Sequence, residues 1–133
     1  MRYAMVMPVV LFLLVIFPFD DSYGDAHAYE CIVLTEQDLG DDGHLRMSKL
    51  AAYKGKAFHV DRASGTILGP VWSNSGHWQK TVLGNGEYLD SFKVLSVSQA
   101  NLATYLVIRE FADGRIKPFV FVIGDMVLTG TCE

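Results

Sequence analysis

The chain has 133 residues, which is enough for one domain. Its residues are 50% hydrophobic, and its formal net charge is −4. This acidic balance argues against a nucleic-acid partner and against an anionic membrane surface, because the basic patch that both require is missing.

The first segment, residues 1–28, has the pattern of a signal peptide. Arg2 precedes an almost wholly apolar run from Tyr3 to Phe19. A polar stretch then ends in Ala26-His27-Ala28, whose small flanking residues suit signal peptidase, so we expect cleavage after Ala28. An uncleaved anchor is the alternative, but the apolar run is shorter than the roughly 20 residues of a membrane span. The segment therefore predicts export, to the periplasm or outside the cell, and no stable membrane insertion after cleavage.

The remaining residues, 29–133, are predicted to form a single β domain with one disulfide. They hold ten Lys and Arg and twelve Asp and Glu, so their net charge is near −2 (10 − 12). The two cysteines are Cys31 and Cys132, and two cysteines in an exported chain are expected to pair. A disulfide that closes a loop of about a hundred residues raises the free energy of unfolding by about 4.7 kcal/mol, because it lowers the entropy of the unfolded chain.

Short β-runs separated by turn signals fill the first half of this domain. Residues 29–35 predict a strand, and residues 37–44 predict an acidic loop. Residues 45–53 suit either one or two helical turns or a ragged strand. Residues 57–68 predict a hairpin, with Gly65 in the left-handed position after a type I turn.

The next hairpin is predicted around Asn85-Gly86, the strongest short turn signal in the chain. A two-residue turn at this place sets Leu83 against Tyr88 and Val82 against Leu89.

A third hairpin is predicted around Asp113-Gly114. It opposes Leu106 to Phe121 and Ile108 to Phe119, with an ion pair between Glu110 and Lys117 and a bulge at Pro118 facing Arg109. Both faces of this strand pair are apolar, which predicts a central place in the sheet or a covering layer. Gly124-Asp125 suits a type II′ turn into the last strand.

These elements predict an all-β fold of about eight short strands with at most one short helix. Strands at this spacing suggest a small antiparallel meander that closes into a barrel, and a β-sandwich is the alternative. The disulfide favours the barrel, because it would place the first and last strands side by side.

Aromatic residues around an irregular loop provide the candidate binding site. The loop is rich in Ser, Asn and Gly, and such loops often carry recognition residues. The same aromatic residues could instead plug the barrel. The predicted binding residues are Trp72, His77, Trp78 and Tyr88.

Metal and cofactor sites are not expected. Asp38, Asp41 and Asp42 precede Gly43, but their spacing is not that of a calcium-binding loop. The histidines outside the signal peptide (His44, His59 and His77) lack the close spacing of a zinc motif.

Catalysis is not expected either. His59 and Asp61 share one face of a strand, with Ser64 in the following turn, which invites a hydrolase interpretation. The serine is not framed by glycines and lies on no nucleophile elbow. Asp61 is better explained as an acceptor for backbone N–H groups of the turn.

A carrier for a small apolar ligand is a further alternative. Four apolar residues, Leu106, Ile108, Phe119 and Phe121, would face the cavity. Eight strands make about the smallest barrel that can hold a ligand, and the short walls favour a filled core.

Several motifs resemble a family of small exported bacterial proteins that has no known activity. They are Phe58-His59-Val60-Asp61-Arg62 with Gly65, Ser91-Phe92-Lys93, Glu110-Phe111, Lys117-Pro118-Phe119 and Gly130-Thr131-Cys132. The resemblance implies no site residues. In plan the fold is also similar to the periplasmic inhibitors of C-type lysozyme, although their short Ser- and Gly-containing motif is not evident, and a shared architecture does not fix function. The sequence thus predicts a non-enzymatic module that binds a protein or a cell-envelope component.

Overall fold

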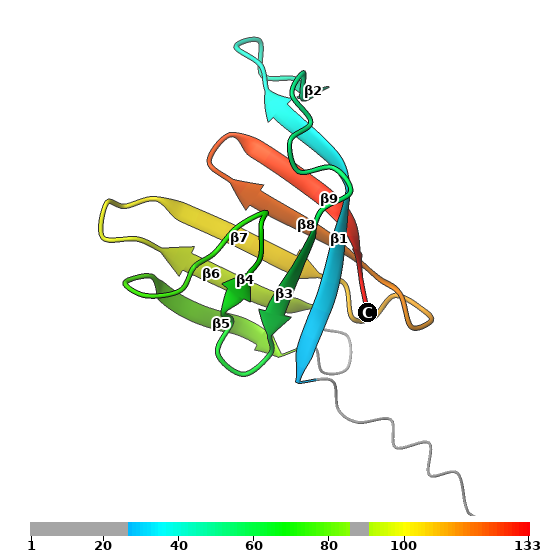
Figure 1. Cartoon of the computed structure of the whole chain (residues 1–133), viewed down its shortest axis with the longest axis vertical. Helices are drawn as coiled ribbons and strands as arrows, with labels where there is room; N and C mark the ends of the chain where they lie inside the picture. Colours follow the sequence, from blue (N-terminus) through cyan, green and yellow to red (C-terminus); the bar gives the residue numbers. More distant parts are fainter. Residues whose placement is uncertain (1–26, 86–90) are drawn as a thin grey trace, which may run out of the picture.

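The computed structural model describes residues 27–85 and 91–133, with side chains except that of Asn85 (Figure 1). Most of the predicted signal peptide, residues 1–26, lies outside the described residues. Within the described part every element is a strand, and no helix there could span a membrane. The strands are β1 (Ala28–Leu39), β2 (Leu45–Met47), β3 (Ala57–Asp61), β4 (Ile67–Leu68), β5 (Gln79–Asn85), β6 (Phe92–Val97), β7 (Ala103–Ile108), β8 (Lys117–Ile123) and β9 (Met126–Cys132).

The strands form one antiparallel sheet in the order β4-β3-β1-β9-β8-β7-β6-β5, with β2 paired to the outer end of β1. Strands β5 to β9 follow one another as a meander, and the first strand then pairs with the last. The sheet curls strongly into a half-barrel (Figure 1). The prediction of an all-β meander is confirmed, with nine strands among the described residues in place of about eight. In the segment predicted over residues 45–53, only residues 45–47 form a strand, β2, and the rest is irregular, so the strand alternative holds in part and the helical one does not.

The predicted disulfide between Cys31 and Cys132 is confirmed. The two cysteines are direct partners in the register between β1 and β9, and their Cα atoms lie 4.0 Å apart. Both side chains are buried. The bond therefore joins β1, the first strand of the chain, to β9, the last strand.

Alternate residues of the strands fill the concave face, as the period of two along a strand requires. Phe58 on β3 lies edge-on to Phe119 on β8, with ring centroids 5.2 Å apart, and also contacts Phe121 at 5.7 Å. The two arms of the curled sheet therefore share one core. Its buried apolar residues are Tyr29, Cys31, Val33, Phe58, Val60, Ile67, Val71, Phe92, Val94, Leu106, Ile108, Phe119, Phe121, Leu128 and Cys132.

Strands β1 and β9 approach each other most closely at Gly130. A Cβ atom at this position would lie 2.0 Å from the carbonyl oxygen of Ile32 and 2.8 Å from the ring of Phe119. The register between the two strands shifts at the same level, between Val33 and Thr35. Leu34 is the extra residue of this bulge, and such bulges bend a strand and increase its twist. Glycine at 130 is therefore required by the space between β1, β9 and the core.

The predicted register between β5 and β6 is wrong. Val82 is opposite Val94, five residues beyond the predicted partner Leu89, and a register shift follows between Val82 and Gly84. The connection includes residues 86–90, which lie outside the described residues. The inward side chains of β6 are fixed by β7, where Phe92 is opposite Ile108. Pairing with the neighbouring strand therefore outweighs the local preference of Asn85-Gly86 for a tight turn.

The predicted register between β7 and β8 is confirmed: Leu106 is opposite Phe121 and Ile108 is opposite Phe119. The ladder ends there, so residues 109–116 form a wider loop than the two-residue turn predicted at Asp113-Gly114. The bulge predicted at Pro118 is wrong, because β7 and β8 show no register shift and Arg109 follows Ile108 opposite Pro118. Arg109 donates its N–H to the Pro118 carbonyl at 2.9 Å, which closes the end of the ladder.

The last hairpin turn forms where it was predicted, whereas the acidic loop is shorter than predicted. The two-residue turn at Gly124-Asp125 is confirmed, since Ile123 pairs with Met126 and Gly124 has a positive φ of 61°. Strand β1 extends to Leu39, so the first part of the predicted acidic loop is strand. Strands β7 and β8 are central, as expected, but their outer side chains Tyr105 and Val120 are exposed.

Candidate functional site

The predicted binding residues lie on the loop that joins β4 to β5, residues 69–78, called here the bridging loop. Strands β4 and β5 are the two ends of the sheet order. The bridging loop therefore crosses the opening of the half-barrel and connects its two free edges.

Asn74 holds the centre of the bridging loop in place. Its side chain is fully buried. The amide group donates to the carbonyl of Gly65 at 3.0 Å and to the hydroxyl of Ser96 at 2.8 Å, and its oxygen accepts from the N–H of Ile67 at 2.6 Å. The backbone N–H of Asn74 also donates to the carbonyl of Ile67 at 3.2 Å. These bonds give the loop a fixed conformation without regular secondary structure.

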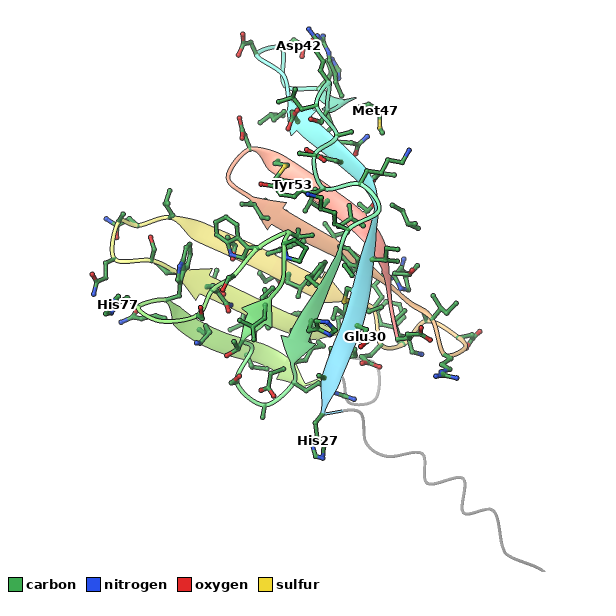
Figure 2. All side chains as sticks on the ribbon, in the orientation of Figure 1. His27, Glu30, Asp42, Met47, Tyr53 and His77 are labelled. Carbon is green, nitrogen blue, oxygen red and sulfur yellow. A yellow bond between two sulfur atoms is a disulfide. The ribbon has the colours of Figure 1, made fainter. Side chains whose placement is uncertain are left out.

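Trp72 and Trp78 pack against each other at the two ends of this anchored segment. Their ring centroids lie 5.4 Å apart with an interplanar angle of 78°, an edge-to-face arrangement. Trp72 is half-buried and packs against the core, and Val71 beside it is buried. The exposed His77 precedes Trp78, and Figure 2 shows it at the periphery of the molecule.

The structure thus gathers three of the four predicted binding residues on one loop. Tyr88 lies outside the described residues. The indole N–H of Trp72 is buried and has no acceptor within hydrogen-bonding distance among residues 27–85 and 91–133. Asn74 was not singled out from the sequence, because an asparagine in a Ser-, Asn- and Gly-rich segment looks like any other loop residue.

The residues of the alternative hydrolase site form a turn. Asp61 accepts hydrogen bonds from the backbone N–H and the hydroxyl of Ser64, both at 2.7 Å. These bonds from Ser64 lower the pKa of Asp61. His59 is exposed and lies across the β1–β3 pair from Glu30, with Nδ1 3.6 Å from Oε1. The turn role that the sequence assigned to Asp61 is confirmed.

The acidic loop is organised by an ion pair. Asp42 pairs with Arg46 and accepts the backbone N–H of His44 at 3.2 Å. In the ranges 27–85 and 91–133, His, Cys, Asp and Glu side chains form no group of three or more that could hold a metal ion.

The four residues that would line a carrier cavity form the centre of the core. Leu106, Ile108, Phe119 and Phe121 are all buried. Phe58 packs against both phenylalanines from the opposite arm of the sheet.

A charged cluster that the sequence did not reveal lies at the β1 end of the core. The hydroxyl of Tyr29 donates to the carboxylate of Glu110, and a guanidinium nitrogen of Arg62 lies 3.8 Å from the same carboxylate. The guanidinium also stacks over the ring of Tyr29, 4.9 Å from its centroid. Burial raises the pKa of Glu110, and the charge of Lys117 partly opposes this. Three residues so far apart in the chain give no local signal of their contact.

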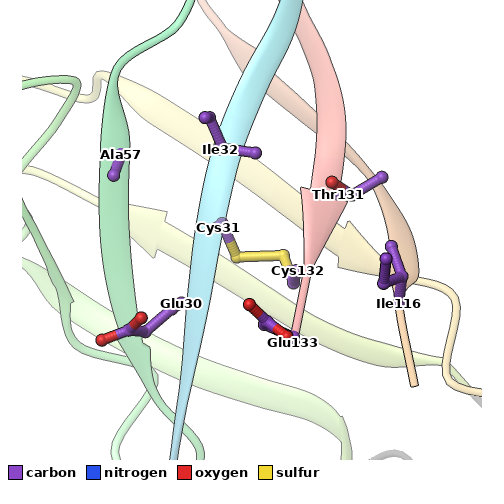
Figure 3. A pocket seen from close by; sticks show the side chains of 8 residues that line it. All are labelled: Glu30, Cys31, Ile32, Ala57, Ile116, Thr131, Cys132 and Glu133. Atoms are coloured by element: carbon purple, nitrogen blue, oxygen red, sulfur yellow. A yellow bond between two sulfur atoms is a disulfide. The ribbon is translucent and has the colours of Figure 1, made fainter.

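Two surface pockets lie away from the bridging loop. A pocket of about 280 Å³ lies beside the disulfide, around Ile32 and Thr131 (Figure 3). A pocket of about 460 Å³ lies on the hairpin of β1 and β2, around Met47 and Leu50. Figure 1 shows this hairpin standing clear of the half-barrel.

No protein-family model, curated protein or solved structure gives a significant match to this chain.

Proposed function

We propose that this protein is an exported, non-enzymatic module that binds another protein or a cell-envelope component through the bridging loop. The observation that supports this proposal is the anchored aromatic pair: Trp72 and Trp78 flank a segment whose centre is fixed by the buried Asn74. Recognition residues are commonly carried by loops on a rigid scaffold.

The rigidity of the loop favours binding. A loop that is already ordered loses little conformational entropy when it meets a partner, so more of the contact energy remains as affinity. Trp78 and the exposed His77 supply an aromatic surface and a polar group side by side. Tryptophan is among the residues that most often dominate the energy of an interface.

The disulfide supports the proposed location. Disulfides form and persist in oxidising compartments, such as the periplasm and the extracellular space. The buried bond between Cys31 and Cys132 fits such a compartment, and we propose that the protein is periplasmic or secreted.

The carrier alternative requires a different interior. A ligand on the concave face would have to separate Phe58 from Phe119 and Phe121, whose rings are in contact. We therefore place the proposed contact surface on the outside of the half-barrel.

A cross-linking experiment in the native host tests the proposal. A photoreactive phenylalanine analogue at position 77 should give a discrete, light-dependent adduct, and Trp78→Ala should abolish it. The same analogue at the exposed Asp125, in the β8–β9 turn, is the matched control and should give no adduct of that mass. An adduct that persists in Trp78→Ala, with an unchanged melting temperature, would contradict a role for the bridging loop.

A further inference from the structure

The pocket beside the disulfide lies on the convex face of the half-barrel, away from the core. It is formed where β3, β1, β9 and the segment before β8 meet (Figure 3). Its walls are mainly apolar. Ile32 and Ile116 keep 42% and 60% of their surface exposed, and Ala57 and Thr131 complete the walls. An apolar group bound here would remove this surface from water.

Two carboxylates stand at one end of these apolar walls. Glu30 and Glu133 are direct partners across β1 and the end of β9, since each donates its backbone N–H to the other's carbonyl, at 2.9 and 3.0 Å. Both side chains line the pocket, and Figure 3 shows them at the opposite end from Ile32 and Thr131. Like charges placed directly opposite each other destabilise a strand pair. The pair of carboxylates therefore favours a cation beside it.

Two basic side chains of the chain lie beside these carboxylates and hold them loosely. His59 approaches Glu30 at 3.6 Å, and Arg115 approaches Glu133 at 3.8 Å. All four side chains are more than half exposed, and ion pairs this exposed are weak and screened by salt. The carboxylates thus remain available to a stronger partner.

An apolar wall that ends in two carboxylates complements a side chain with an apolar stem and a cationic end. Lysine and arginine have this form, because their methylene stems pack on apolar surface while the charge reaches a polar neighbour. We propose that this pocket binds a lysine or arginine side chain of an extended segment of a partner protein. The stem would lie against Ile32 and Ile116, and the charge would lie between Glu30 and Glu133.

This pocket is a second surface, separate from the bridging loop. The two share no residue. The pocket proposal therefore does not rest on the proposed function, and either one can fail without the other.

The test is a titration of the isotope-labelled protein, purified with its disulfide formed, followed by amide chemical shifts. The probe is an acetylated and amidated pentapeptide of alternating leucine and lysine, and its control has glutamine in place of lysine. We expect saturable shifts at residues 30–32, 57, 116 and 131–133 with the lysine peptide. The glutamine peptide should bind at least tenfold more weakly.

Variants of the protein distinguish binding of the peptide in the pocket from general attraction of a cationic peptide to an acidic surface. The double variant Glu30→Gln with Glu133→Gln should lower the affinity for the lysine peptide at least tenfold. Asp41→Asn with Asp125→Asn removes the same charge from two exposed sites outside the pocket and should leave the affinity within twofold. Ile116→Ser should weaken binding while keeping both carboxylates.

Four results would overturn the proposal. The first is a titration without saturable shifts at the pocket, and the second is equal binding of the two peptides. The third is equal weakening by the two double variants, which would indicate attraction by net charge alone. The fourth is equally tight binding of free lysine amide, which would indicate a small cation and not a protein segment.

Discussion

The side-chain amide of Asn74 donates a hydrogen bond to the hydroxyl of Ser96 at 2.8 Å, and both residues are fully buried. Asn74 belongs to the loop between the two end strands of the sheet, whereas Ser96 lies on β6 inside the other arm. The same asparagine also binds Gly65 and Ile67 at the β3–β4 hairpin. One side chain thus connects the two arms of the curled sheet across its opening.

Asn74→Ala should lower the free energy of unfolding by about 3 kcal/mol or more, because it leaves three buried groups without their hydrogen-bond partner. Its loss leaves buried hydrogen-bonding groups at positions 65, 67 and 96 unsatisfied, and each such group costs roughly 1–3 kcal/mol. Urea denaturation of the purified protein measures the change. Ser73→Ala, at the exposed neighbouring position, is the control and should change stability by less than about 0.5 kcal/mol. Equal stability of the two variants would show that the arms do not depend on this side chain.

Removal of the disulfide should lower stability without changing the fold class. Cys31→Ala combined with Cys132→Ala should lower the free energy of unfolding by roughly 2–5 kcal/mol, because the unfolded chain regains the freedom of a long loop. Reduction of the unmodified protein should give a similar loss, and the double variant should then be insensitive to the reductant. Denaturation curves with and without dithiothreitol measure both effects. An unchanged midpoint on reduction would contradict the prediction.

Gly130→Ala should be strongly destabilising, by more than about 3 kcal/mol. The added Cβ would meet the carbonyl oxygen of Ile32 at 2.0 Å, and this contact is relieved only if β1 moves away from β9. Gly40→Ala is the matched control, since its Cβ would meet first the end of the flexible Asp42 side chain. Thermal unfolding should separate the two variants by many degrees. Similar melting temperatures would mean that β1 and β9 can move apart at little cost.

Glu110 should make stability depend on pH in the direction opposite to that of most carboxylates. Burial raises the pKa of Glu110, so the folded state holds this proton more tightly than the unfolded chain does. Its contribution to stability is then present below the ordinary carboxyl pKa and is lost as pH rises through the raised pKa.

Glu110→Gln isolates this contribution, because the amide keeps the shape of the side chain and does not titrate. We expect the stability of the variant relative to the unmodified protein to increase as pH rises from about 4 to 7. Urea denaturation at a series of pH values measures the difference. Asp125→Asn, at an exposed turn, should show no such trend. A constant difference between Glu110→Gln and the unmodified protein would contradict the direction of the shift.

Trp72→Phe should leave stability unchanged or raise it. The buried indole N–H of Trp72 has no acceptor within the described part of the chain, and phenylalanine removes this donor while it keeps an aromatic ring against the core. Trp72→Ala should instead lose about 2 kcal/mol, since the ring is half-buried. Thermal unfolding of the two variants distinguishes them. A large loss in Trp72→Phe would indicate that the indole N–H has a partner.

Sequence patterns were sufficient to predict the features that depend on residues close together in the chain. The β7–β8 register follows from the match of Leu106 and Ile108 to Phe119 and Phe121, since a slip of one residue would turn one of these two pairs of side chains away from the core. The turn at Gly124 follows from a backbone angle that glycine adopts without strain.

Contacts between distant segments could not be predicted in this way. Val82 is opposite Val94 because pairing with β7 fixes the position of β6. The residues around Asn85-Gly86 carry no signal of this pairing. The anchoring role of Asn74 and the cluster of Tyr29, Arg62 and Glu110 exist only once the sheet has curled. The candidate site was therefore predicted as a loop with aromatic residues, whereas its rigidity became visible only in the structure.

The disulfide also determines how the protein responds to mechanical force. Cys31 and Cys132 are 101 residues apart in the chain but adjacent across β1 and β9. Tension applied to the chain on the outer sides of these two cysteines would pass directly through the sulfur–sulfur bond. The strands between them would carry no load, so the bridging loop and the core would keep their shape while the molecule is pulled between two attachments.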